Sequence, residues 1–88
     1  MKAETNLTNK DFFKKIYDEH FEKLFYFSKK FVMSDDIAKD ILSEVFYNCW
    51  NHIDKLRKIE NIRSYLYTCV RNESNKFLRS QFKKMVIP

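Results

Sequence analysis

Five polar and basic residues near the end of the chain recur at the spacing of one helix face. They are Arg71, Asn72, Asn75, Lys76 and Arg79. Residues three and four positions apart are neighbours on a helix surface, so these side chains share a strip. Arg and Lys neutralise phosphates, and Asn can pair with base edges. The pattern favours a polyanion such as nucleic acid, and the competing interpretation is an ordinary solvated face of a lysine-rich protein.

Further residues before this strip suit the same chemistry. Lys58 and Arg63 add positive charge just before it, and Tyr65 and Tyr67 offer rings on which unpaired bases could stack. Together with the strip, the candidate nucleic-acid residues are Lys58, Arg63, Tyr67, Arg71, Asn72, Asn75, Lys76 and Arg79.

Charge is distributed unevenly along the chain, whose formal net charge is +5. Residues 34–55 hold two Lys and five acidic residues, for a net charge of −3. Residues 56–88 hold eight Lys or Arg and two Glu, for a net charge of +6. An acidic helix and a basic helix in one small domain indicate two partners of opposite charge.

Catalysis and metal binding find little support in the sequence. His20 and His52 are 32 residues apart and belong to no motif with an acid and a nucleophile. A chain with no Gly cannot form a glycine-rich phosphate loop. Cys49 and Cys69 have no ligand spacing and fall on apolar helix faces, which favours small reduced core residues over a disulfide or a metal site. We expect no enzyme activity, no cofactor and no metal.

The elements that must position these residues are predicted to be helices. Eighty-eight residues form one domain, and a chain with no Gly and a single proline, Pro88, lacks the turn residues that hairpins need. The expected fold is therefore all-α, a compact bundle of three to four helices with its core at about residues 8–82.

Three helix starts are marked by short oxygen-bearing side chains, at Thr8, Ser34 and Asn61. The first helix is expected to break or kink near residues 18–20, because its apolar pattern runs for about 25 residues. The polar residues between Asp54 and Asn61 are expected to form a loop, and the segment after Ser80 a frayed end or linker.

Apolar residues recur with a helical period and predict the core. Phe46 and Trp50 of the middle helix are expected near the centre of the core. The predicted core face of the last helix consists of Ile62, Tyr65, Leu66, Cys69, Val70, Phe77 and Leu78.

No apolar run approaches the length of a membrane span, and the first ten residues lack the apolar segment of a signal peptide. The sequence therefore predicts a cytoplasmic protein with no membrane insertion.

Three stretches resemble bacterial sigma factors. DIAKDILSEVFYNCW (residues 36–50) is similar to a signature helix that runs A-E-D, two hydrophobic residues, Q-E-V-F, and then Trp four residues on. ENIRSYLYTCVRNESNKFLRSQ (residues 60–81) is similar to the family's Y-L-Y, R-N and terminal L-R pattern. FFKKIYDEHFEKLFYFSKKFV (residues 12–32) resembles the helical pair that precedes them. Loop length and spacing fit the extracytoplasmic-function (ECF) type, and the resemblance covers about residues 10–82.

The resemblance implies conserved region 2 of a sigma factor. Such a domain docks on the clamp helices of the RNA polymerase β′ subunit, recognises the −10 promoter element and captures an unpaired base of the non-template strand. Polymerase contacts would then fall on the acidic helix, at Asp36, Asp40, Ser43 and Glu44. Asn72 is expected to contact a base or the adjacent backbone, and residues 56–60 to wall the base pocket. An anti-sigma factor is a further expected partner. The alternative is a helical domain that binds only proteins and has no role on DNA.

Three positions depart from the family pattern. Lys39 stands where a Glu is usual, Ser43 where a Gln is usual, and Thr68 where many members carry a basic residue. Docking should therefore depend on the three carboxylates of the acidic helix. The helix-turn-helix domain that reads the −35 element in ECF factors is absent from these 88 residues. The trailing KKMVIP favours excision just before the linker over a natural truncation.

Overall fold

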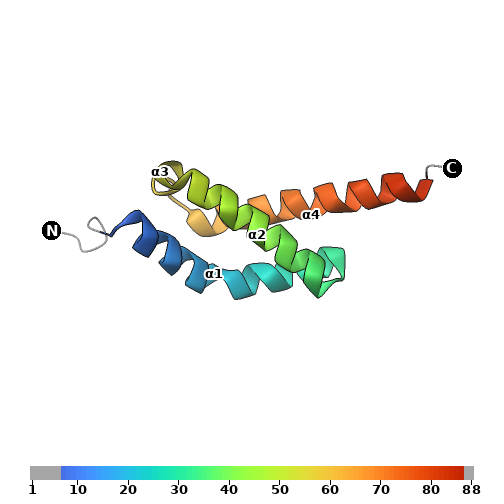
Figure 1. Ribbon diagram of the computed structural model, residues 1–88, viewed down its shortest axis with the longest axis horizontal. Coiled ribbons are helices and arrows are strands. Elements are labelled where there is room, and N and C mark those ends of the chain that lie inside the picture. The colour runs from blue at the N-terminus through green and yellow to red at the C-terminus, as the bar shows by residue number, and fades with distance from the viewer. Residues whose placement is uncertain (1–6, 87–88) are drawn as a thin grey trace.

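The structure, a computed structural model, describes residues 7–86, with side chains described as far as Lys83. Four helices follow one another in that range: α1 (Asn9–Val32), α2 (Asp35–Asn51), α3 (Ile53–Leu56) and α4 (Ile62–Val86). Figure 1 shows α2 crossing α1, with α4 emerging behind α2. The prediction of an all-α bundle is confirmed.

Each long helix begins at the cap that the sequence predicts. Thr8 Oγ1 accepts a hydrogen bond from the Asp11 N–H at 3.0 Å, and Ser34 Oγ accepts one from the Ile37 N–H at 3.3 Å. Asn61 Oδ1 accepts from the Ser64 N–H at 3.0 Å. These bonds satisfy amide groups that have no partner within the first turn of a helix.

Two helices continue further than the sequence predicts. α1 runs through residues 18–20 without the break predicted there, and neither Pro nor Gly interrupts it. Its length is supported by core residues from Ile16 to Val32. α4 is helical as far as Val86, past the frayed end or linker predicted to follow Ser80, since the residues there are tolerated in helices and none before Pro88 breaks one.

The short helix α3 begins at Ile53 and overlaps the start of the segment predicted as a loop. Ile53 and Leu56 are buried and attach it to the core. Arg57 then binds the start of α1. Its Nη2 donates to the Leu7 carbonyl at 3.0 Å, and its guanidinium carbon lies 4.8 Å from the centroid of the Phe12 ring. The sequence did not predict these contacts, because most residues of the segment are polar.

The core lies where the three long helices meet. Phe46 is 3% exposed, as predicted, whereas Trp50 is 43% exposed and does not lie at the centre. Trp50 packs at the edge, with its ring centroid 5.4 Å from that of Phe13, and leaves one side open. Tyr65 and Leu78 were also predicted as core residues and are likewise exposed over more than a third of their surface.

Two polar side chains lie inside the core. Ser28 of α1 and Ser74 of α4 are fully buried, and their hydroxyl oxygens are 2.9 Å apart. This hydrogen bond fixes α1 against α4 deep in the domain.

The turn between α1 and α2 is short. Met33 adopts the left-handed conformation (φ 58°, ψ 31°), and its N–H donates to the Lys29 carbonyl at 2.8 Å. Glycine usually fills such a position, and this chain has none. An ion pair of 2.9 Å between Lys29 Nζ and Asp35 Oδ1 spans the same turn.

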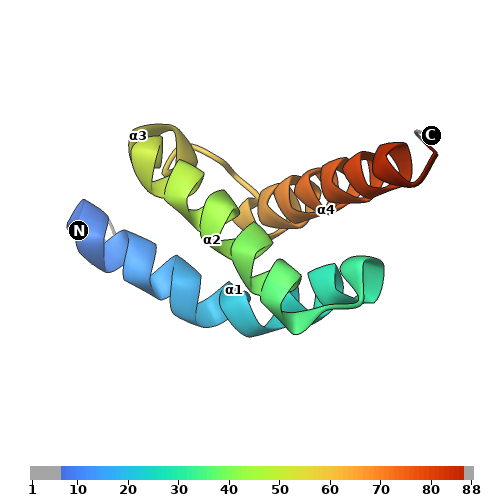
Figure 2. The same ribbon diagram turned by 45° about the vertical axis from the view of Figure 1, so that its right-hand side comes forward.

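The described part of the domain is elongated. Its principal extents are 61 × 21 × 18 Å. Figures 1 and 2 both show the last turns of α4 extending beyond the other helices. The core therefore supports only the first part of α4.

Candidate nucleic-acid interface

The predicted nucleic-acid residues lie on α4 and the segment before it, at the surface. Tyr67 and Asn75 are half-buried, and the others are exposed, namely Lys58, Arg63, Arg71, Asn72, Lys76 and Arg79. Most of these side chains are therefore accessible to a partner.

This surface reaches both flanks of α4. On the flank beside α1, the Tyr67 ring lies 4.8 Å from the Phe27 ring, measured between centroids, and the Arg63 guanidinium carbon lies 5.5 Å from the Tyr67 centroid. On the flank beside α2, Asn72 and Lys76 line two separate hollows. The helix thus presents its polar residues to two different neighbours.

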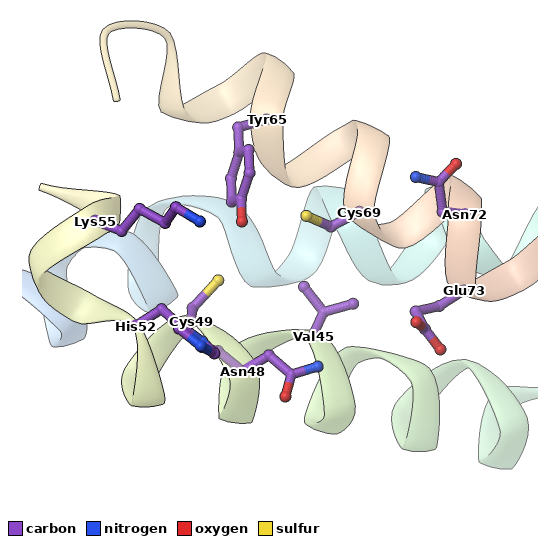
Figure 3. Close-up of a pocket in the computed structure, with 9 residues that line it drawn as sticks. All are labelled: Val45, Asn48, Cys49, His52, Lys55, Tyr65, Cys69, Asn72 and Glu73. Atoms are coloured by element: carbon purple, nitrogen blue, oxygen red, sulfur yellow. The ribbon is translucent and has the colours of Figure 1, made fainter. Parts of the chain in front are cut away.

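Asn72 lies at a pocket of about 480 Å³ between α2 and α4. In Figure 3, Tyr65 and Cys69 extend from α4 toward α2, and Cys49 extends from α2 toward α4. Lys55 occupies one end of the pocket, and Asn72 and Glu73 the other. The complete lining is Val45, Asn48, Cys49, His52, Lys55, Tyr65, Cys69, Asn72 and Glu73. Its volume falls within the range of about 300–1,000 Å³ that is typical of small-ligand sites.

The pocket contains groups that recognise ligands by hydrogen bonding. His52 Nδ1 lies 3.0 Å from the Asn48 carbonyl oxygen. Because a carbonyl only accepts, this nitrogen donates, and a neutral ring leaves Nε2 as an acceptor. Asn48 and Asn72 each supply a carboxamide that donates and accepts.

Burial keeps the thiols and the phenol of the pocket protonated. Burial, with a smaller contribution from the neighbouring Cys69, raises the pKa of Cys49 to about 11. Burial also raises the pKa values of Cys69 and Tyr65. Cys49 and Cys69 are free thiols, buried and half-buried respectively, and at neutral pH they form the neutral floor of the pocket.

Sequence reasoning missed four polar residues of the pocket, Asn48, His52, Lys55 and Glu73. Asn48 and His52 are four residues apart and so share a helix flank, but only the packing of α4 beside α2 shows that this flank faces Asn72. Residues 56–60, predicted to wall the base pocket, do not line this hollow between α2 and α4, and their role beside a base stays a prediction. Leu56 is 2% exposed because it belongs to the core.

The predicted acidic surface lies on α2, where Asp36, Asp40, Ser43 and Glu44 are exposed. Asp40 and Glu44 also line a groove of about 330 Å³ together with Lys76 of α4. The acidic and basic surfaces are therefore adjacent. Lys39, which departs from the family pattern, is exposed on the same helix.

A family model described as Sigma-70 region 2 matches residues 16–83. The match covers most of the chain, from within α1 to near the end of α4, and the chain belongs to this family. A search of the curated proteins and a search of the solved structures found no significant match.

Sigma-70 region 2 binds RNA polymerase and recognises and melts the −10 promoter element. It is a non-enzymatic domain, and its partners are core polymerase and −10 promoter DNA. The division between an acidic α2 and a basic α4 agrees with these two partners. Within residues 7–86, no helix is long and apolar enough to cross a membrane.

Proposed function

We propose that this chain is region 2 of an ECF-type sigma factor that acts in the cytoplasm. It captures an unpaired base of the non-template −10 strand beside Asn72, and it docks on the β′ clamp helices of RNA polymerase through α2. An anti-sigma factor is a further proposed partner, which follows from the ECF assignment. The ECF type is supported by loop length and spacing and by the resemblance over residues 10–82.

The single observation that carries the base-capture proposal is the position of Asn72. Asn72 is exposed and lines the pocket at one end, and in Figure 3 its carboxamide is directed outward from α4, away from α2. A strand that runs along α4 could therefore place a base in the pocket without a rearrangement of the core. His52, Asn48 and the Lys55 amine would then surround the edges of the base.

The cations on α4 would hold the backbone of the captured strand. Arg71 and Lys76 are exposed on either side of Asn72, and Arg79 lies two turns beyond it. Lys58 and Arg63 extend the positive surface toward the start of the helix. Phosphate contacts of this kind fix the register of the strand, and base contacts select the sequence.

Docking on polymerase is proposed for Asp36, Asp40, Ser43 and Glu44. These residues occupy consecutive turns of α2 and are exposed together. Within residues 7–83, none of their three carboxylates takes part in an ion pair. They are therefore available to a basic partner surface.

The test is a fluorescence-anisotropy titration of single-stranded oligonucleotides that vary in sequence, at several salt concentrations. Asn72→Ala should reduce the preference among sequences by about tenfold, since a good base contact discriminates by roughly 1–3 kcal/mol. Arg79→Ala should weaken binding to every sequence and flatten the salt dependence.

Asn51→Ala is the matched control, because Asn51 is an exposed carboxamide of α2 that does not line the pocket. It should bind as the parent does. An equal loss for all sequences in Asn72→Ala would reduce Asn72 to a backbone contact. Undetectable binding at low salt, alongside intact polymerase binding, would favour a domain that binds only protein.

A further inference from the structure

An aromatic contact fixes the second half of α1 beside the first half of α4. The Phe27 and Tyr67 rings meet edge to face, with centroids 4.8 Å apart and planes at 71°. Phe31 packs edge to face on Phe27 at 5.2 Å. The buried Ser28–Ser74 hydrogen bond fixes the two helices next to this cluster.

Cations flank this aromatic contact on both helices. Lys23 precedes Phe27 by four residues and Lys30 follows it by three, so both project from the same face of α1 as Phe27. Arg63 and Arg71 are each four residues from Tyr67 and share its face of α4. We call these four residues, Lys23, Lys30, Arg63 and Arg71, the α1–α4 basic seam.

The seam is free to bind a partner. All four side chains are exposed, and none takes part in an ion pair with another described residue. Glu19 lies at one end, near the start of α4, where it lines a pocket with Arg57 and Ile62. The Arg63 guanidinium lies over the Tyr67 ring. This cation–π contact holds the charge of Arg63 at the seam, and it covers a face of Tyr67 on which a base would otherwise stack.

We propose that the seam holds the phosphate backbone of one DNA strand, with Lys23 and Lys30 of α1 as contacts additional to those on α4. The stretch from Arg63 to Arg71 spans about 12 Å of helix, enough to face roughly three or four phosphates of one strand. The four charged groups are all cations and include no carboxamide, so the contact is independent of sequence. The inference rests on the proposed function only in taking promoter DNA as the ligand.

The experiment compares two double variants of the 88-residue chain. Lys23→Gln/Lys30→Gln removes the α1 half of the seam. Lys10→Gln/Lys39→Gln removes the same charge from exposed residues elsewhere. Lys10 lies 13 residues before Lys23, about 20 Å along α1, beyond the distance over which exposed charges interact at 0.1 M salt. Thermal melts confirm that both variants fold.

Binding is measured by anisotropy with single-stranded oligonucleotides of several sequences across a salt series. The seam variant should lose about 1.4 in the slope of log K against log salt, and roughly 25-fold in affinity at 0.1 M salt, equally for every sequence. The control should keep the parent's slope. Equal losses in the two variants, or no loss in the seam variant, would overturn the seam.

The seam and the base pocket can fail separately. If the seam variant binds as tightly as the parent and keeps the parent's preference among sequences, the seam is refuted and base capture stands. Binding that shows no sequence preference but weakens in the seam variant supports the seam and refutes base capture. A parent chain that binds no DNA at low salt refutes both.

Discussion

Ser28 and Ser74 place two hydroxyl groups in the core, where neither residue has exposed surface. The two hydroxyl groups form a hydrogen bond with each other. A buried hydroxyl without a partner is costly, whereas the removal of both hydroxyls leaves an apolar contact of similar shape. The pair therefore contributes more to the geometry of α1 against α4 than to net stability.

We predict that Ser74→Ala lowers the free energy of unfolding by about 1–3 kcal/mol, because it leaves the Ser28 hydroxyl buried without a partner. Ser28→Ala/Ser74→Ala should recover most of this loss. Urea denaturation of the parent, both single variants and the double variant measures the coupling energy. Losses that simply add in the double variant would show that the two hydroxyls act independently.

At the scale of residues, the sequence predicted which kinds of side chain α4 carries better than it predicted which residues lie beside them in the fold. The basic and carboxamide residues of α4 follow from helical spacing alone. Asn48, His52 and Lys55 do not, because their proximity to Asn72 depends on how α2 packs against α4. Trp50 was misplaced for a related reason, since periodicity assigns a face to a residue but does not show how far the neighbouring helix covers that face.

At the scale of elements, α1 and α2 pack through a run of aromatic rings. Phe46 meets Phe13, Tyr17 and Phe21, with ring centroids 4.9–6.1 Å away. Trp50 meets Phe13 at the edge of the same group. Phe46 and Trp50 therefore differ in burial although they lie four residues apart on α2.

We expect Phe46→Ala to cost about 3–5 kcal/mol, the usual penalty for truncating a buried aromatic ring, and so to unfold much of a domain of ordinary stability. Trp50→Ala should cost clearly less, because 43% of that side chain is already exposed. Thermal melts of the two variants make the comparison. A Phe46→Ala melt as high as the parent's would contradict the core described above.

Helix starts were predictable because a cap is a local signal, and all three long helices begin where Thr8, Ser34 and Asn61 indicate. The extents of α1 and α4 were not, since the sequence carries no stop signal and length alone suggested a break. α3 was missed because its burial depends on two residues, Ile53 and Leu56, in a polar segment.

Across the whole molecule, the acidic and basic surfaces adjoin rather than oppose each other. Asp40, Glu44 and Lys76 line one groove between α2 and α4. A polymerase surface bound to α2 would therefore lie next to DNA held on α4. In the sequence the acidic and basic residues belong to different helices. The packing of α2 against α4 brings the two groups of residues together.

We predict that Asp40→Arg or Glu44→Arg abolishes co-purification with core polymerase while the helical content stays unchanged. Exposed ion pairs are individually weak, so the reversal must add repulsion to have this effect. Asp54→Arg is the control, since Asp54 is exposed on α3, outside the proposed docking face. If both α2 reversals bind polymerase as the parent does, α2 is not the docking face.

The extension of α4 beyond the core has a consequence for its local stability. Residues 80–83 are exposed, and Phe82 is 64% exposed. A helical segment without tertiary support is marginal in water, so these turns should open without unfolding the domain. Amide hydrogen exchange should be fast from residue 80 onward, whereas Leu66 and Val70 should exchange only through global unfolding. A partner that requires this end of α4 to be helical must therefore supply the free energy of ordering it, and its affinity should rise with any substitution that raises helix propensity there.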